Sequence, residues 1–304
     1  MKNLSLKNTD LKISAVGIGC MRLYGLPDEK ALLELVDTAI ENGINFFDHA
    51  DVYGGGRCEQ MFGRAVPASY RDRIILQSKC CIRRGLYDAS ESYILQQVDK
   101  SLQNLNTDHL DILLLHRPDP LMEPEEIASA FDKLAASGKV RYFGVSNHNP
   151  MQIELINKYV GGRILIDQVQ LSIAHCPTID AGINVNIAND AACVRDGSLI
   201  EYARLNDIRL QAWSPFQYGM FEGTFIGSEK YPELNAVLDR LAEKYGCSQN
   251  AIAVAWIMRH PAGIQTIVGT TNKGRVADIA KACDITLTRG EWYELYLSAG
   301  KKLP

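Results

Sequence analysis

Short apolar runs rich in β-branched residues alternate with amphipathic stretches along the chain, and this alternation restricts the possible folds more than any other feature. Each run is apolar on both faces, as in the strands of a buried parallel sheet. We expect eight such strands, over Ala15–Gly19, Asn45–Asp48, Ile74–Lys79, Leu110–His116, Val140–Ser146, Asp167–Gln170, Arg209–Trp213 and Gln265–Val268.

The amphipathic stretches carry signals for the beginning and end of helices. Proline opens several of them, Ser90 is a candidate N-cap, and Gly43 and Gly138 stand where C-cap residues are expected. The predicted helices cover Asp28–Asn42, Tyr93–Leu105, Glu125–Ser137, Met151–Tyr159 and the stretch from Ser248 to Arg259.

Eight strands that alternate with helices over 304 residues are typical of a (β/α)₈ TIM barrel. We therefore expect one domain over residues 1–304, with Asn3–Ile13 forming a β-hairpin outside the barrel, turning at Asn8-Thr9-Asp10. The long segments His175–Gly197 and Phe216–Tyr231 follow the sixth and seventh strands and lack clear periodicity. Long loops at the C-terminal face of a barrel are usually functional.

Composition excludes several classes of protein. The formal net charge of −4 argues against nucleic-acid binding, and no apolar run approaches the ~20 residues that span a bilayer. The eight cysteines are scattered without a Cys-x-x-Cys pair, and the N-terminus does not resemble a signal peptide. These features predict a cytoplasmic protein with reduced thiols and without a metal site.

Four polar residues stand at or after the ends of predicted strands. Asp48 ends the second strand, Lys79 the third and His116 the fourth, while Tyr53 follows Asp48 by five positions. In a barrel these side chains converge on one rim. The ammonium of Lys79 would then lower the phenol pKa of Tyr53 from its ordinary ~10, and Asp48 would keep the lysine charged.

Such a group could reduce a carbonyl. Tyr53 would act as general acid and His116 would orient the carbonyl oxygen while a hydride arrives from elsewhere. Each residue also has a structural explanation, since Lys–Asp pairs, loop tyrosines and strand-end histidines are common in barrels. Their placement on successive strands favours the catalytic hypothesis.

The segment Phe47-Asp48-His49-Ala50-Asp51-Val52-Tyr53-Gly54, with Glu59 after it, resembles the signature of the aldo-keto reductase family. The contexts of Lys79 and His116 are similar to those of the other two catalytic residues of that family. Further similar segments are Asp111–His116 and Gly138–Asn147, and His116 is followed by Arg-Pro-Asp-Pro as in a bacterial branch. The resemblance covers nearly the whole chain and implies a carbonyl reductase that uses NADPH.

The resemblance also implies a cofactor site. Ser146, Asn147 and Gln168 match nicotinamide carboxamide contacts, Trp213 matches the ring stacked on the nicotinamide, and Arg275 matches the main cation for the 2′-phosphate. The full set of implied cofactor residues is Gly19, Cys20, Ser146, Asn147, Gln168, Trp213, Ser214, Pro215, Phe216, Gly219, Gly269, Thr270, Thr271, Asn272, Lys273, Arg275 and Asp278. Met21 and Tyr24 are candidate substrate contacts.

Several positions depart from the family. Many relatives carry lysine where Asn272 stands, so NADH stays open as the cofactor, and Thr270–Asn272 also fits a plain helix N-cap. Met21 occupies a position that is often tryptophan. We expect a monomer that acts on a small carbonyl compound.

Two rival functions stay open. A metal-dependent hydrolase could use Asp48, His49, Asp51 and His116, but the His-x-His pair common in barrel hydrolases is missing from the sequence. An NADPH-binding regulatory or redox-sensing protein could retain all four catalytic residues.

Overall fold

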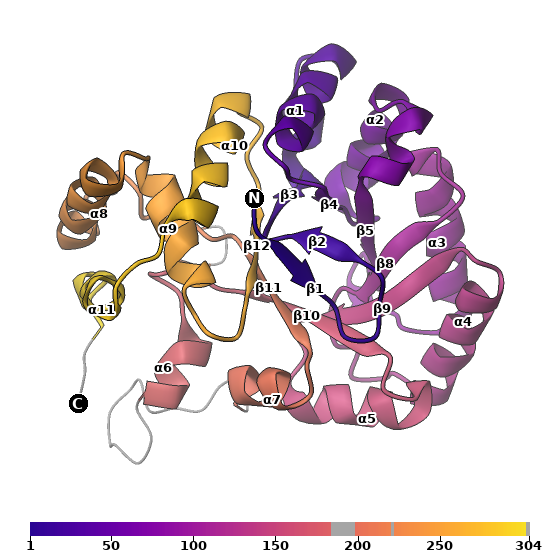
Figure 1. The fold of residues 1–304 in the computed structure, drawn as a ribbon. Helices are drawn as coiled ribbons and strands as arrows, with labels where there is room; N and C mark the ends of the chain where they lie inside the picture. The colour runs from indigo at the N-terminus through magenta and orange to yellow at the C-terminus, as the bar shows by residue number, and fades with distance from the viewer. Residues whose placement is uncertain (184–197, 220–221, 302–304) are drawn as a thin grey trace.

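The computed structural model describes residues 1–183, 198–219 and 222–301, and eight parallel strands in it close into a barrel (Figure 1). The barrel order is β3-β4-β5-β8-β9-β10-β11-β12, so strands adjacent in the barrel follow one another along the chain. The strands are β3 Val16–Gly19, β4 Phe46–Asp48, β5 Ile75–Cys80, β8 Leu110–Leu115, β9 Val140–Ser146, β10 Ile164–Gln170, β11 Arg209–Trp213 and β12 Gln265–Val268. The predicted (β/α)₈ barrel is confirmed.

Helices surround the barrel, and α8 and α11 pack farther out, beside α9 (Figure 1). The five predicted helices lie within about two residues of their expected bounds. Asp28 and Asn149 cap α1 and α5 through their side chains, whereas Ser90 occupies the N-cap of α3 without a side-chain cap bond. The helices are α1 Glu29–Glu41, α2 Arg57–Ala65, α3 Glu91–Leu105, α4 Pro124–Ala136, α5 Pro150–Val160, α6 Pro177–Ile183, α7 Leu199–Leu205, α8 Pro232–Tyr245, α9 Gln249–Met258, α10 Lys273–Ala280 and α11 Arg289–Ser298.

The shorter elements include the predicted N-terminal hairpin. β1 Asn3–Ser5 pairs antiparallel with β2 Lys12–Ser14, and Asn8 in the turn has a φ of 56°. A second hairpin, β6 Ile82–Arg83 with β7 Leu86–Tyr87, follows β5. The 3-10 helices are η1 Cys20–Gly25, η2 Tyr53–Gly56, η3 Ala68–Arg73 and η5 Lys281–Asp284.

The hairpin closes the N-terminal end of the barrel. Leu6, Leu11 and Ile13 are buried against side chains from the barrel strands, among them Phe46 and Ile112. Figure 1 shows the hairpin lying across this end. The opposite end, where the strands finish, is therefore the open one.

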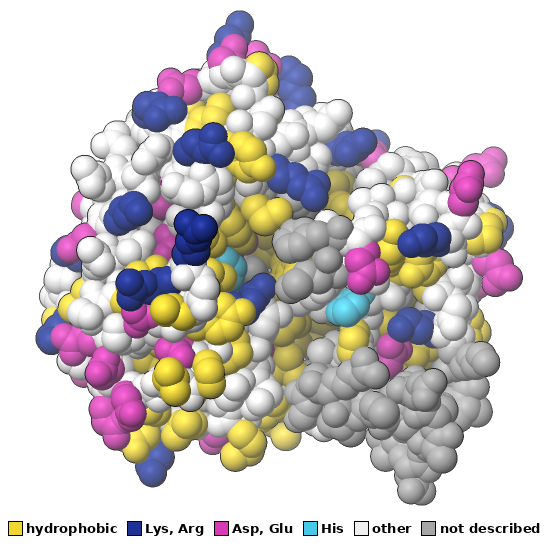
Figure 2. All heavy atoms as spheres, turned by 180° about the vertical axis from the view of Figure 1, so that it is seen from behind, with side chains coloured by type: hydrophobic (Ala, Val, Ile, Leu, Met, Phe, Trp, Pro, Cys, Tyr) yellow, Lys and Arg dark blue, Asp and Glu magenta, His cyan; other side chains and the backbone are white. Residues whose placement is uncertain are grey.

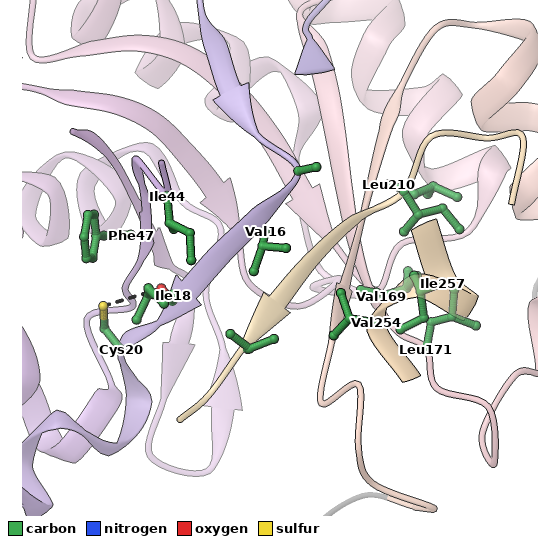
Figure 3. Packing of buried hydrophobic residues seen from close by; sticks show 14 of the residues in the cluster. Val16, Ile18, Cys20, Ile44, Phe47, Val169, Leu171, Leu210, Val254 and Ile257 are labelled. Carbon is green, nitrogen blue, oxygen red and sulfur yellow. Dashed lines mark hydrogen bonds between the residues drawn. The ribbon is translucent and has the colours of Figure 1, made fainter. Parts of the chain in front are cut away.

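A larger core lies between the strands and the helices (Figure 3). In the close view, Val16, Ile18 and Phe47 lie in one part of this core, and Leu210 lies with Val254 and Ile257 of α9 in another. Burying each such aliphatic side chain stabilises the fold by about 1.5–3 kcal/mol. This packing fixes the position of each strand and therefore the positions of the residues at its C-terminal end.

A layer of glutamines crosses the barrel interior below its open end. Gln77 Nε2 donates to Asp48 Oδ1 over 2.6 Å, and both Gln77 and Gln168 donate to Gln211 Oε1 over 2.9 Å. Gln211 in turn donates to Gln265 over 2.7 Å. The buried amides satisfy one another and provide a polar floor for Asp48.

The two long segments expected to be irregular contain some regular structure, and part of each lies outside the described residues. The segment 175–197 is not wholly irregular, because its residues 177–183 form α6, whereas 184–197 lie outside the described residues. In the segment 216–231, Gln217 and Thr224 form an antiparallel bridge, and 220–221 lie outside the description. In the described part of the chain, no helix is long and apolar enough to cross a membrane.

Candidate active site

The four strand-end residues meet at the open end of the barrel. Asp48 is the last residue of β4, Lys79 lies in β5, His116 directly follows β8, and Tyr53 opens η2. Lys79 Nζ lies 2.6 Å from Asp48 Oδ1 and 3.1 Å from the Tyr53 hydroxyl. The rings of Tyr53 and His116 meet edge to face with centroids 5.9 Å apart.

Local backbone geometry brings Tyr53 to this position. Gly54, Gly55 and Gly56 have φ values of 59°, 68° and 90°, a region that glycine enters without a steric cost. These glycines belong to the 3-10 turn η2, which leads directly into α2. The turn holds the Tyr53 ring beside Lys79.

Lys79 is the centre of the charge network. Its ammonium also donates to the carbonyl oxygen of His49 over 2.8 Å, so it has three oxygen partners within a buried site. Burial by itself lowers the pKa of Lys79, but the neighbouring Asp48 carboxylate and the Tyr53 hydroxyl raise it above its ordinary value. The lysine therefore stays protonated.

The pKa of Tyr53 differs from the sequence-based expectation. Burial raises it above the ordinary value of a phenol, and the opposing charge of Lys79 does not outweigh this effect. The expected net lowering is therefore wrong, because desolvation of the phenolate dominates. Tyr53 holds its proton at neutral pH.

His116 is a neutral imidazole. Burial and the positive charges of Lys79 and Arg117 hold its pKa well below the usual range. Its Nδ1 atom is buried and lacks a hydrogen-bond partner among the described residues. A neutral imidazole beside the Tyr53 hydroxyl can donate its N–H hydrogen bond to a carbonyl oxygen.

A pocket of about 580 Å³ opens above these residues. The face opposite the hairpin is hollowed near its centre, where apolar side chains gather with Lys and Arg side chains around them (Figure 2). The pocket is lined by Gly19, Met21, Arg22, Tyr24, Asp48, Val52, Tyr53, Gly54, Arg57, Ile82, His116, Arg117, Ser146, Gln168, Trp213, Ser214, Pro215, Phe216, Gln217, Thr224, Ile267 and Gly269. Both candidate substrate contacts, Met21 and Tyr24, are among them.

Eight of the implied cofactor residues line this pocket. They are Gly19, Ser146, Gln168, Trp213, Ser214, Pro215, Phe216 and Gly269. The pocket suits a planar heteroaromatic ring carrying an amide, because Trp213 offers an aromatic face and Ser146 and Gln168 offer polar atoms. Trp213 Nε1 lacks a hydrogen-bond partner among the described residues, and a Cβ at Gly269 would meet nothing within 4 Å. The residues present therefore fit a nicotinamide cofactor.

The remaining nine lie outside the pocket lining, within the described residues. The Cys20 side chain is buried and directed to Ile18 O at 3.6 Å (Figure 3), Asn147 Nδ2 donates to Ser146 over 2.8 Å, and Gly219 lies against Glu222. The others stand before or on α10: Thr270, Thr271, Asn272, Lys273, Arg275 and Asp278.

The side chains of three residues of the implied cofactor site at α10 already have partners within the protein. Asn272 is the N-cap, since its side chain accepts from the Arg275 amide over 3.1 Å. Lys273 pairs with Glu34 of α1 over 2.7 Å, and Asp278 pairs with Lys281 over 3.1 Å. The exposed guanidinium of Arg275 has no ion pair with a described carboxylate.

Sequence reasoning missed several lining residues. Arg57 follows the glycine turn and Arg117 follows His116, so their closeness to candidate catalytic residues was the available signal. Arg22 likewise follows the candidate Met21, Val52 precedes Tyr53, and Gln217 and Thr224 lie in the long segment Phe216–Tyr231, whereas Ile82 and Ile267 carried no comparable signal. Within the described ranges, no group of three or more His, Cys, Asp or Glu side chains could hold a metal ion.

Comparison with known proteins agrees with this geometry. Residues 15–296 match the model of the aldo/keto reductase family. The chain is 36% identical to the uncharacterized oxidoreductase YcsN of Bacillus subtilis, with 94% of each chain covered. It is 34% identical to 6-dehydroglucose reductase of Agrobacterium fabrum, with 88% of each chain covered.

Among solved structures, the chain resembles a thermostable aldo-keto reductase, Tm1743, with a TM-score of 0.79 and 27% identity. That similarity covers 98% of this chain and 100% of the other. The family match and the oxidoreductases among its relatives make this protein an NAD(P)-dependent oxidoreductase. The chain belongs to the aldo/keto reductase family.

Proposed function

We propose that this protein reduces aldehydes or ketones to alcohols with NADPH, and that Tyr53 is the proton donor. The observation that carries the proposal is the 3.1 Å contact between Lys79 Nζ and the Tyr53 hydroxyl at the base of the pocket. The family assignment supports carbonyl reduction in general. The roles of individual residues are our inference from their geometry.

The carbonyl oxygen of the substrate would lie between Tyr53 and His116. When bound, the reduced nicotinamide supplies a hydride to the carbonyl carbon. The Tyr53 hydroxyl then gives its proton to the carbonyl oxygen, and the neighbouring Lys79 stabilises the phenolate that is left. Asp48 keeps Lys79 charged and in place, and solvent restores the proton on Tyr53.

Trp213, Ser146 and Gln168 would hold the nicotinamide, and Ser214–Phe216 would border the phosphates. Arg275 and Lys273 would bind the 2′-phosphate, which distinguishes NADPH from NADH. The helix N-terminus at Asn272 favours an anion there. Lys273 can bind the 2′-phosphate only if the phosphate displaces Glu34 from its ion pair with Lys273.

The experiment that tests the proposed function is a spectrophotometric assay of NADPH oxidation with a panel of aldehydes and ketones. Equal amounts of NADPH consumed and alcohol formed, with slower turnover of NADH, would support it. NADPH binding without turnover of any carbonyl would instead favour the regulatory or redox-sensing alternative. We further propose that the chain acts as a cytoplasmic monomer with one catalytic domain. Light scattering of the purified protein tests the oligomeric state.

A further inference from the structure

Three arginines line the pocket, although the chain has a formal net charge of −4. They are Arg22, Arg57 and Arg117. Arg22 follows Gly19 and Cys20, which are candidate cofactor contacts. Arg57 and Arg117 instead accompany the candidate catalytic residues, since Arg117 is next to His116 and Arg57 follows the turn that Tyr53 opens.

Arg117 is half-buried beside the proposed reacting centre. Its Nη1 donates to the carbonyl oxygen of His116 over 2.8 Å, which anchors one edge of the guanidinium. A guanidinium carries five N–H donors, so one such bond leaves most of them available. After burial and the charge of Lys79, the positive charge of Arg117 also contributes to the lowered pKa of His116.

Arg57 is exposed at the pocket and is held from two sides. Its Nε donates to the carbonyl oxygen of Gly54 over 2.9 Å, and its guanidinium lies 5.3 Å from the centre of the Tyr24 ring. Both Gly54 and Tyr24 line the same pocket. These contacts orient the guanidinium while its Nη groups stay available.

Neither arginine is neutralised by a carboxylate in the described part of the chain. Neither forms an ion pair with a carboxylate of the described residues, although Arg64, Arg83 and Arg240 elsewhere on the surface do. Among the described lining residues, Asp48 is the only carboxylate, and it is already paired with Lys79. A positive pocket of this kind concentrates anions.

We propose that the substrate is an anionic carbonyl compound, and that Arg117 and Arg57 bind its carboxylate or phosphate group. A guanidinium matches either group through paired N–H···O bonds. The apolar lining from Met21, Ile82 and Phe216 would hold the carbon skeleton between the anionic group and the carbonyl. This inference rests on the proposed carbonyl reduction and specifies its substrate class.

The test compares pairs of aldehydes that differ in charge, with NADPH at saturation. One pair is 4-carboxybenzaldehyde and methyl 4-formylbenzoate, and the other is glyceraldehyde 3-phosphate and glyceraldehyde. The measured quantity is the ratio of kcat/KM for the anionic member to that for the uncharged member. The variants are Arg117→Gln and Arg57→Gln, with Arg204→Gln as control, because Arg204 is exposed on α7 and lies outside the pocket lining.

We expect a wild-type ratio of about ten or more in at least one pair, which corresponds to one charge-assisted hydrogen bond. The pair that shows it identifies a carboxylate or a phosphate as the preferred group. The ratio falls about ten-fold in Arg117→Gln and also falls in Arg57→Gln, while Arg204→Gln leaves it unchanged. Added salt lowers the wild-type ratio because it screens the attraction.

A wild-type ratio of one or less in both pairs would overturn the anionic substrate while leaving carbonyl reduction intact. A high ratio that persists in both pocket variants would remove the two arginines from the explanation. If none of the four aldehydes is reduced but other aldehydes or ketones are, the anionic substrate is overturned and carbonyl reduction stands. If no carbonyl compound is reduced with either cofactor, the proposed function fails and this inference fails with it.

Discussion

The ammonium of Lys79 lies 2.6 Å from Oδ1 of Asp48, and both side chains are withdrawn from solvent. The same carboxylate oxygen also accepts from Gln77 over 2.6 Å and from Gln168 over 3.3 Å. The ion pair is thus built into the polar floor of the barrel. Its removal should affect both stability and catalysis.

Replacing Lys79 with Met leaves Asp48 buried without its cation. We expect the free energy of unfolding to fall by about 3–5 kcal/mol, because an uncompensated buried charge is costly. Urea unfolding followed by circular dichroism measures the change. Lys273→Met serves as control, since it breaks the exposed pair with Glu34 and should alter stability little. Equal losses in the two variants would contradict this view of the buried pair.

Tyr53→Phe removes the proposed proton donor with little change in shape. Lys79 keeps Asp48 and the His49 carbonyl as partners, so the urea midpoint should stay near that of the wild type. We expect kcat/KM for aldehydes to fall by about 10²–10⁴. Cofactor binding, measured by quenching of tryptophan fluorescence, should persist.

Tyr159→Phe is the matched control for that variant. Tyr159 is exposed on α5 and lies outside the pocket lining. Full activity in Tyr53→Phe would eliminate Tyr53 as the acid, and a comparable loss in Tyr159→Phe would point to a general effect of the substitution.

Asp51 should make stability depend on pH. Burial, with the nearby Glu59 carboxylate, raises its pKa from 3.8 to about 7, and both its oxygens lack hydrogen-bond partners among the described residues. Because the folded state binds this proton more tightly than the unfolded state, stability is fully present below pH ~4 and falls as the pH rises to about 7. The size of this loss is on the order of 4 kcal/mol.

Asp51→Asn removes that titration. The unfolding free energy of the variant, relative to the wild type, should therefore rise between pH 4 and pH 7 by ~4 kcal/mol. Unfolding in urea at several pH values gives the difference, and exposed Asp72→Asn is the control. A difference that does not vary with pH would mean that Asp51 does not take up a proton in this range.

Cofactor preference should respond to Glu34, although Glu34 lies on a different helix. Its carboxylate holds Lys273 over 2.7 Å, so Glu34→Gln should free Lys273 and lower the KM for NADPH without a matching change for NADH.

Arg275→Gln should raise the KM for NADPH about ten-fold. Initial-rate measurements with both cofactors test this, with Glu41→Gln as the control on the same helix. Equal effects on NADPH and NADH would place these residues away from the 2′-phosphate.

The order of elements was predictable because it is encoded locally. Alternation of strands and helices, prolines and cap residues at helix ends, and the turn near Asn8 all depend on neighbours in sequence. The four polar residues at strand ends were found in the same way, since parallel strands of a barrel finish on one rim.

The sequence by itself therefore determined the eight-stranded barrel, its hairpin and the set Asp48, Tyr53, Lys79 and His116. Only the tertiary structure decided how strongly these groups are desolvated, and desolvation reversed the expected direction of the Tyr53 pKa. It also decided that Gln211, 134 residues from Gln77, completes the floor under Asp48, and that Arg57 and Arg117 face one pocket. Burial and long-range contacts depend on how side chains pack once the barrel has closed, and local sequence patterns do not specify that packing.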